Sequence, residues 1–244
     1  MTSILAIDAS SEACSVALWR DGVIDESFEY SPRSHTKRLL PMIDALLNKH
    51  EISGAALDAI AFAAGPGSFT GLRICLGVVQ GLAFGWRCPV IPISTLQAMA
   101  LTAQRTLSLG MGESILVALD ARMSEVYAGF YQVANNTVIA LSADAVLAPS
   151  LVAARFLASK PAATVHAIGP GWHYPDMPVL NGADARLEWY PHAQDVAVLA
   201  ASAFAKGNAI HAMSAEPIYL RNTVSWKKRE KKRIVPADQS RNSE

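Results

Sequence analysis

The chain has 244 residues, of which 51% are hydrophobic and 17% charged, with 21 basic and 21 acidic side chains. This composition predicts a globular protein with one large domain or two domains of about 100 residues. Residues 1–220 carry 13 basic and 18 acidic groups, whereas residues 221–244 carry 8 and 3. A slightly acidic body argues against extensive nucleic-acid binding outside the basic end of the chain.

The cysteine pattern and the N-terminal stretch favour a cytoplasmic location. Cys14, Cys75 and Cys88 form no closely spaced pair, which is typical of a reducing compartment. The N-terminal stretch has neither a basic leader nor a cleavage-like segment, so we expect no secretory signal. The apolar stretch 74–86 is too short to cross a bilayer and predicts a buried helix instead, so we expect no membrane association.

The first half of the chain predicts three strands followed by alternating helices and strands. Asp21-Gly22 is a strong hairpin signal, and Ser34 precedes a broad apolar stripe that contains one proline, Pro41. The glycine-rich segment 65–71 joins a small-residue strand to an apolar helix. Strands are expected at 4–8, 13–20, 23–30, 59–64 and 88–93, and helices at 34–50, 71–86 and 94–105.

The second half repeats this order after a glycine-containing connector at 107–112. Strands are expected at 115–120, 125–133, 137–141 and 165–168, and helices at 150–159 and 194–206. We therefore expect an N-terminal lobe at 1–106, a C-terminal lobe at 107–224 and a basic, flexible tail at 225–244.

Two ordered repeats indicate an internal duplication. The tetrapeptide that ends in Asp8-Ala9 recurs as the one that ends in Asp120-Ala121, and Gly65-Pro66-Gly67 recurs as Gly169-Pro170-Gly171. Two similar α/β lobes would place Asp8 and Asp120 at strand ends that face a cleft, where open α/β sheets bind ligands. The alternative is that both aspartates only close turns.

The same region offers weak candidates for nucleotide binding. A glycine loop before a helix can present N–H groups to a phosphate, and nearby serines can add hydroxyl donors. No Walker lysine accompanies the loop, so a tight structural turn is the favoured interpretation. The candidates are Asp8, Ser10, Ser11, Gly65 and Gly67.

Three segments resemble one protein family. The opening 7–10 hairpin, the Gly-Pro-Gly-Ser-Phe-Thr-Gly-Leu-Arg segment at 65–73 and Pro-Ile-Tyr-Leu-Arg at 217–221 closely resemble the bacterial TsaB (YeaZ) family. The resemblance covers nearly the whole chain up to Arg221. It implies an α/β fold of the duplicated actin-like and Hsp70-like class (ASKHA, ribonuclease H-like) with two similar lobes, in agreement with the repeats.

The resemblance also implies a function. Members of this family help to make threonylcarbamoyladenosine beside the anticodon of tRNA, as a non-catalytic subunit that pairs with the paralogue TsaD and works with the ATPase TsaE. The resemblance implies a TsaD heterodimer, a homodimer when the subunit is alone, and no cofactor of its own, although ATP or ADP could lodge at the interface of the complex. The basic tail would either touch tRNA or serve as a solubilising extension.

The residues themselves support a non-catalytic role. A TsaD-type metal site needs an H-x-x-x-H pair on a helix, but the matching segment at 94–99 has no histidine. Ser68 stands in the wrong position for the G-x-S-x-G motif of hydrolases. We expect no catalytic residue and no metal. An independent ATP-dependent phosphotransferase and, less favoured, a peptidase are the alternative functions.

Glycines at every fourth position predict a helix with an open face. Each glycine in a helix interior costs about 0.5 to 1 kcal/mol relative to alanine, and close packing of another helix would offset this cost. Packing against the protein's own sheet is the alternative. The resemblance favours a partner interface made by both N-terminal helices, with Leu39, Met42, Ile43, Leu46, Ile74, Gly77, Val78, Gly81, Leu82 and Gly85.

Overall fold

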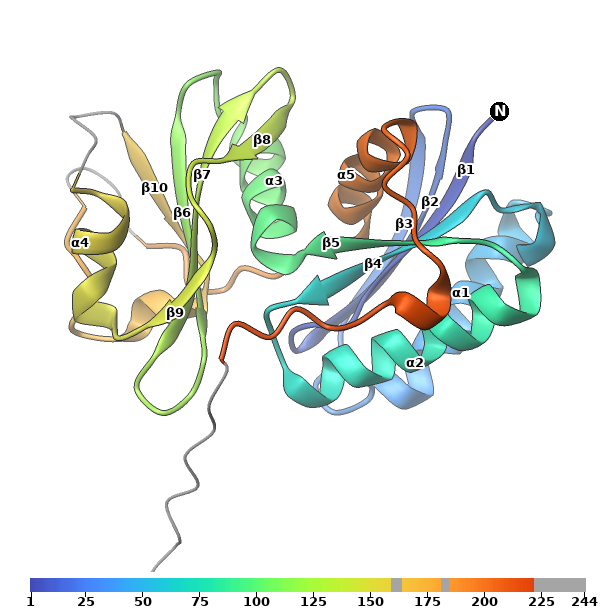
Figure 1. Cartoon of the computed structure of the whole chain (residues 1–244), viewed down its shortest axis with the longest axis horizontal. Coiled ribbons are helices and arrows are strands. Elements are labelled where there is room, and N and C mark those ends of the chain that lie inside the picture. The colour runs from blue at the N-terminus through green and yellow to red at the C-terminus, as the bar shows by residue number, and fades with distance from the viewer. Residues whose placement is uncertain (159–163, 181–184, 222–244) are drawn as a thin grey trace, which may run out of the picture.

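Two β-sheets lie side by side with helices between and around them (Figure 1). The computed structural model describes residues 1–158, 164–180 and 185–221. The expected tail, 225–244, lies outside the described residues. The first sheet has the order β3-β2-β1-β4-β5, formed by Val23–Tyr30, Ala13–Arg20, Ser3–Asp8, Ala59–Gly65 and Val90–Ser94.

The second sheet repeats the pattern of the first. Its order is β10-β6-β7-β8, formed by Val165–Ile168, Ser114–Asp120, Val126–Ala134 and Thr137–Ala140, and β9 (Ala145–Leu147) pairs with β7. In both sheets the first strand pairs antiparallel with the second and parallel with a strand that follows a helix. The duplication that the repeats predicted is confirmed at the level of strand order.

The predicted turns and helices are largely confirmed. Asp21 and Gly22 have φ values of 46° and 93° in the β2–β3 hairpin, as a type I′ turn requires. The predicted helix at 150–159 is wrong, because a single 3₁₀ turn is followed there by a very short α4. The helices are α1 (His35–Lys49), α2 (Phe69–Trp86), α3 (Thr95–Leu107), α4 (Val152–Phe156) and α5 (Ala193–Ala205).

The two faces of the first sheet differ in side-chain size. Ala6, Ala17 and Ala61 lie in the core cluster that contains α3 and α5. Leu5 and Phe62, which alternate with the alanines along the strands, lie in the cluster that contains α1 and α2. Because side chains alternate across a strand, α5 covers the small-residue face and α1 and α2 cover the large-residue face.

The expected boundary between residues 106 and 107 does not match the packing. Helix α3, from the first half of the chain, packs on β6, β7 and β8 of the second sheet. Helix α5, from the second half, packs on β1, β2 and β4 of the first. Each half thus covers the other half's sheet, which strand and helix patterns along the chain do not reveal.

A buried ion pair joins these two helices. Asp195 on α5 has a side chain that is only 2% exposed, and it accepts hydrogen bonds from Arg105 Nε at 3.0 Å and Nη2 at 2.8 Å. Thr102 on α3 donates a third bond, of 2.8 Å, to the same carboxylate. The carboxylate is therefore fully engaged by α3, which fixes the helix from one half against the helix from the other.

Helix α2 passes a simple test for a membrane span. By length and composition it could cross a membrane, with a mean hydropathy of 1.3 over 18 residues. The expectation that the apolar stretch is too short was wrong, because the helix begins at Phe69. However, Leu72, Cys75 and Val79 are buried toward the first sheet, as in a core helix, although only 28% of the helix is buried.

We predict that Asp195→Ala lowers the free energy of unfolding by roughly 2 to 3 kcal/mol, because it removes three hydrogen bonds to a buried charge. Glu29→Ala is the matched control, since Glu29 also accepts two bonds from an arginine, Arg38, but on the surface. That control should cost less than about 1 kcal/mol. Urea denaturation followed by circular dichroism measures both, and equal losses would contradict a special role of the buried pair.

Candidate functional site

Asp8 ends β1 and is 1% exposed. Its Oδ1 accepts a 2.6 Å hydrogen bond from the backbone N–H of Ser10, which closes a tight turn. Among the described residues, its buried Oδ2 has no hydrogen-bond partner. Burial raises the pKa of this carboxyl to about 6, and hydrogen bonding to Ser10 offsets part of the effect. Asp8 therefore holds a turn and is shielded from substrate.

The first turn of α5 lies beside Asp8. Ala193 donates its N–H to Ser15 Oγ at 2.9 Å, and Ser15 pairs with Asp8 across β1 and β2. Glu26 of β3 accepts a backbone N–H of the same turn at 3.0 Å and lies 2.9 Å from His192 Nδ1. A carboxylate at a helix N-terminus is favourable. These groups serve to seat α5 on the sheet next to Asp8.

The glycine loop packs against the β1–β2 turn. A Cβ on Gly67 would lie 2.4 Å from the carbonyl oxygen of Ser10, and one on Gly71 would lie 2.0 Å from that of Ala9. Ser68 donates its N–H to the Ser10 oxygen at 2.8 Å, and its Oγ accepts the N–H of Gly71 at 3.3 Å. The glycines allow two backbones to touch, which supports a structural turn over a phosphate cradle.

The segment that ends in Arg221 contacts the other side of the same loop. Ile218 donates its N–H to the carbonyl oxygen of Ala64 at 2.7 Å, and a Cβ on Gly65 would lie 2.8 Å from the Ile218 oxygen. Ser11 Oγ accepts the N–H of Ala13 at 3.2 Å. The structure thus brings the nucleotide candidates of the sequence close together, but the chain's own groups engage them: Asp8, Ser10, Ser11, Gly65 and Gly67.

The second lobe repeats this geometry. Asp120 Oδ1 accepts the N–H of Arg122 at 2.7 Å, as Asp8 does from Ser10, and also the hydroxyl of Tyr174 at 2.9 Å. A Cβ on Gly171 would lie 2.7 Å from the carbonyl carbon of Ala118, so this glycine also allows close backbone packing. Both aspartates close turns, as the alternative interpretation of the repeat proposed.

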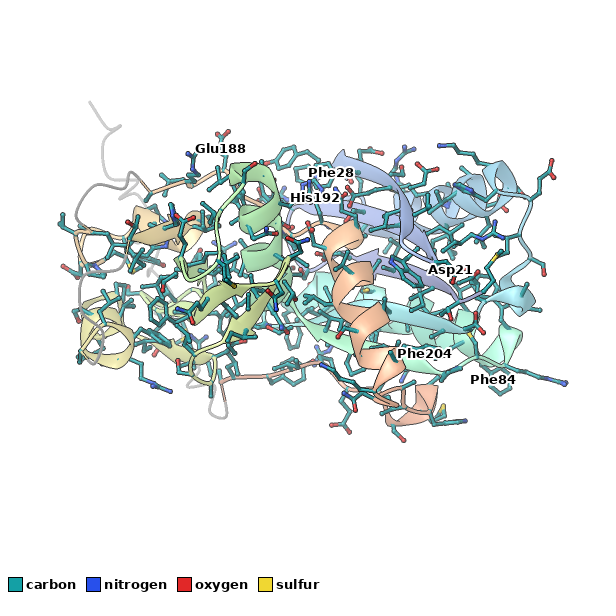
Figure 2. The ribbon with its side chains drawn as sticks, turned by 90° about the horizontal axis from the view of Figure 1, so that it is seen from above. Asp21, Phe28, Phe84, Glu188, His192 and Phe204 are labelled. Carbon is teal, nitrogen blue, oxygen red and sulfur yellow. The ribbon has the colours of Figure 1, made fainter. Side chains whose placement is uncertain are left out.

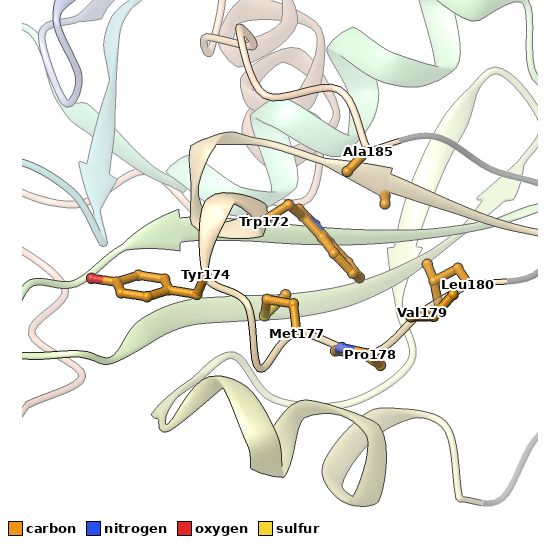
Figure 3. A pocket seen from close by; sticks show the side chains of 8 residues that line it. Trp172, Tyr174, Met177, Pro178, Val179, Leu180 and Ala185 are labelled. Atoms are coloured by element: carbon orange, nitrogen blue, oxygen red, sulfur yellow. The ribbon is translucent and has the colours of Figure 1, made fainter.

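The remaining candidates for chemistry are few. Within residues 1–158, 164–180 and 185–221, no group of three or more His, Cys, Asp and Glu side chains could hold a metal. One cavity of about 210 Å³ lies in the second lobe beside Trp172 and Met177 (Figure 3). Tyr174 also lines it, but its ring points away from the other lining side chains and its hydroxyl is bonded to Asp120. The other lining residues are apolar, so the cavity offers no catalytic group.

The glycine face of α2 is open. Among the described residues, no atom lies within 4 Å of a Cβ built on Gly77, Gly81 or Gly85. Phe84, on the same side of the helix, is 81% exposed and lies on the side of the first lobe away from the second (Figure 2). The alternative that the glycines pack against the protein's own sheet is therefore wrong. Ile74, Val78 and Leu82 are partly buried beside them.

Helix α1 does not contribute the expected residues to this surface. The apolar stripe on α1 packs on the first sheet, because an amphipathic helix buries its apolar face in its own core first. Only Leu40, among the large apolar residues of this helix, is strongly exposed. The expectation of an interface was wrong for four buried residues: Leu39, Met42, Ile43 and Leu46.

Sequence reasoning missed an exposed cluster at the start of α2. The guanidinium carbon of Arg73 lies 3.4 Å from the ring centroid of Phe69, and the rings of Phe69 and Tyr219 are 6.3 Å apart. All three lie in the segments that carried the family resemblance, but the sequence gave them no role. Their separation by about 150 positions along the chain hides the contact, and no local signal could reveal it.

The strand order and the duplicated turns define the class: a two-lobed protein of the actin-like, ribonuclease H-like fold. A family model described as "TsaD: tRNA N6-adenosine threonylcarbamoyltransferase" matches residues 26–178. The chain belongs to the TsaB (YeaZ) family, so the resemblance seen in the motifs is confirmed.

Two relatives and one solved structure carry this assignment. The tRNA threonylcarbamoyladenosine biosynthesis protein TsaB of Escherichia coli (strain K12) is 42% identical over 232 residues, which cover 92% of this chain and 97% of that protein. Its Haemophilus influenzae namesake is 40% identical over 235 residues, with coverages of 93% and 96%. The structure of YeaZ from Pseudomonas aeruginosa matches with a TM-score of 0.83 at 42% identity, over 90% of this chain and 100% of that one.

The raised pKa of Asp8 predicts a pH-dependent stability. The native pKa of about 6 exceeds the ordinary value of 3.8, so the native state holds this proton more tightly than the unfolded chain. The contribution of Asp8 to the free energy of unfolding is therefore full below about pH 4 and falls by about 3 kcal/mol as the pH rises through 6.

Asp8→Asn should remove this loss while its amide oxygen still accepts the Ser10 N–H. The difference in unfolding free energy between the variant and the unsubstituted chain should therefore grow in the variant's favour from pH 4.5 to pH 7. Urea denaturation at several pH values measures it. Parallel pH profiles would contradict the prediction.

Proposed function

We propose that this chain works in the biosynthesis of threonylcarbamoyladenosine in tRNA as a non-catalytic subunit that docks onto a TsaD-family protein. It pairs with TsaD as a heterodimer, works together with TsaE, and forms a homodimer when alone. It acts in the cytoplasm, where tRNA is modified. Family membership and the printed names of its relatives support this pathway.

The open glycine face of α2 carries the proposal. Gly77 and Gly81 each cost the helix about 0.8 to 1 kcal/mol relative to alanine, and within the described part of the chain nothing packs on them to offset that cost. A second helix that lies along the face could contact the backbone directly. Phe84 would be the large apolar side chain that such a partner buries. The docking face therefore consists of Ile74, Gly77, Val78, Gly81, Leu82, Phe84 and Gly85.

The geometry near the two aspartates supports a role without catalysis. Asp8 is sealed in the core, and Asp120 is held by Arg122 and Tyr174. Ser68 caps α2 with its hydroxyl oxygen and so is already engaged in the fold. A phosphotransferase or a peptidase would need a side chain that reaches substrate. We propose that the chain has no cofactor of its own, and that ATP or ADP, where present, lodges at the junction with the partner.

Gly81→Leu should abolish docking while the monomer stays folded. Because a Cβ at this position meets open space, the larger side chain fits in the monomer but blocks a closely packed partner helix. Sedimentation velocity with and without TsaD measures the association. Ser202→Leu is the control, since it adds the same side chain to an exposed position of α5. Retained association in Gly81→Leu would contradict a docking face on α2.

The isolated chain should turn over negligible ATP, and its addition to TsaD, TsaE, tRNA and the threonylcarbamoyl donor should restore transfer to tRNA. Gly81→Leu should fail to restore transfer, whereas Ser202→Leu should restore it fully. Thin-layer chromatography of digested tRNA measures the product. Robust ATP turnover by the chain alone would instead favour the phosphotransferase.

A further inference from the structure

The exposed cluster at the start of α2 consists of Phe69, Arg73 and Tyr219, and we call it the aromatic cluster. Phe69 is 58% and Tyr219 47% exposed, although aromatic side chains are usually buried. The Arg73 guanidinium lies 3.4 Å above the centroid of the Phe69 ring and 6.0 Å from that of Tyr219. Two accessible rings and one cation therefore meet at one point of the surface.

Arg73 gains little from its own fold beyond this stacking. Within the described ranges, no carboxylate forms an ion pair with it and no acceptor forms a hydrogen bond with it. It lies near the N-terminus of α2, where the helix dipole disfavours a cation, and the first turn has no acidic residue. Stacking on Phe69 holds the planar group in place with its donors free, which suits a phosphate or the edge of a base.

The cluster lies where the basic end of the chain begins. Tyr219 is two residues before Arg221, whose side chain pairs with Glu125 and so fixes this segment on the second lobe. The following residues, 222–244, include seven basic and three acidic ones, whereas residues 1–220 have an excess of acidic groups. The charge around the cluster therefore complements a polyanion.

We propose that the aromatic cluster is a contact site for single-stranded tRNA: an unpaired base stacks on Phe69 and Tyr219, and Arg73 binds the adjoining phosphate. Every base has a flat face that stacks on aromatic rings, and an arginine beside the rings supplies both charge and donors. This inference rests on the proposed role in tRNA modification and adds to it a direct RNA contact on this subunit. The basic end of the chain extends the same contact.

The test uses the full chain and a fluorescein-labelled single-stranded RNA, with fluorescence anisotropy as the readout. Phe69→Leu and Tyr219→Leu should each weaken binding by roughly 5-fold to 100-fold, because a base loses its stacking surface. Tyr219→Phe keeps the ring and should bind like the unsubstituted chain. The same RNA annealed to its complement should bind more weakly, since its bases are already stacked.

Arg73→Gln should weaken binding and reduce the slope of log affinity against log salt by about 0.7, the value for one phosphate contact on a single strand. Arg155→Gln is the matched control, because Arg155 is also exposed and lies 5.2 Å from an aromatic ring, that of Phe156, in the second lobe. It should change neither the affinity nor the slope.

Two results would overturn the inference. One is unchanged RNA affinity in Phe69→Leu, Tyr219→Leu and Arg73→Gln. The other is unchanged RNA affinity together with loss of TsaD association, which would make the cluster a protein contact. Gly81→Leu separates this inference from the docking proposal: it should keep the RNA affinity of the isolated chain while losing TsaD.

Discussion

The packing of α5 on the alanine face of the first sheet is the constraint on which the rest of the molecule depends. Ala6, Ala17 and Ala61 leave room for the helix backbone to approach the strands, and Asp195 ties the helix to α3 of the other half. With that face covered, α1 and α2 must cover the opposite one. Helix α2 then has one buried side and one side turned to solvent, and its glycines lie on the solvent side.

Local patterns along the chain predict the elements well because each depends on near neighbours. The hairpin at Asp21-Gly22 follows from residues that accept positive φ, and the caps at Ser68 and Ser94 follow from hydroxyls that accept helix N–H groups. The exchange of α3 and α5 between the sheets depends on contacts across about 90 positions, so it could not be derived from local patterns. Alternation of small and large residues in 59–63 was the one available sign that the two faces receive different helices.

The candidate interface shows the same division between local and long-range information. An apolar stripe such as that on α1 is equally suited to a core or a partner, so the sequence could not distinguish them, and the core holds Leu39 and Ile43. A glycine in a helix differs, because it costs stability and contributes no apolar surface of its own. The regular spacing of Gly77, Gly81 and Gly85 therefore identified the open face correctly, whereas hydrophobicity alone did not.

The buried Asp8 explains how a site can keep its geometry without its chemistry. Its carboxylate closes the turn at Ser10, and the carbonyl oxygen of Ser10 accepts the N–H of Ser68, which begins α2. A group that is costly to bury is thus used to set the position of a helix rather than to react. The start of α2 then presents Phe69 and Arg73 beside Tyr219, and the rest of the helix presents its glycines. Both surfaces through which this chain would act on other molecules therefore follow from one turn at the end of β1.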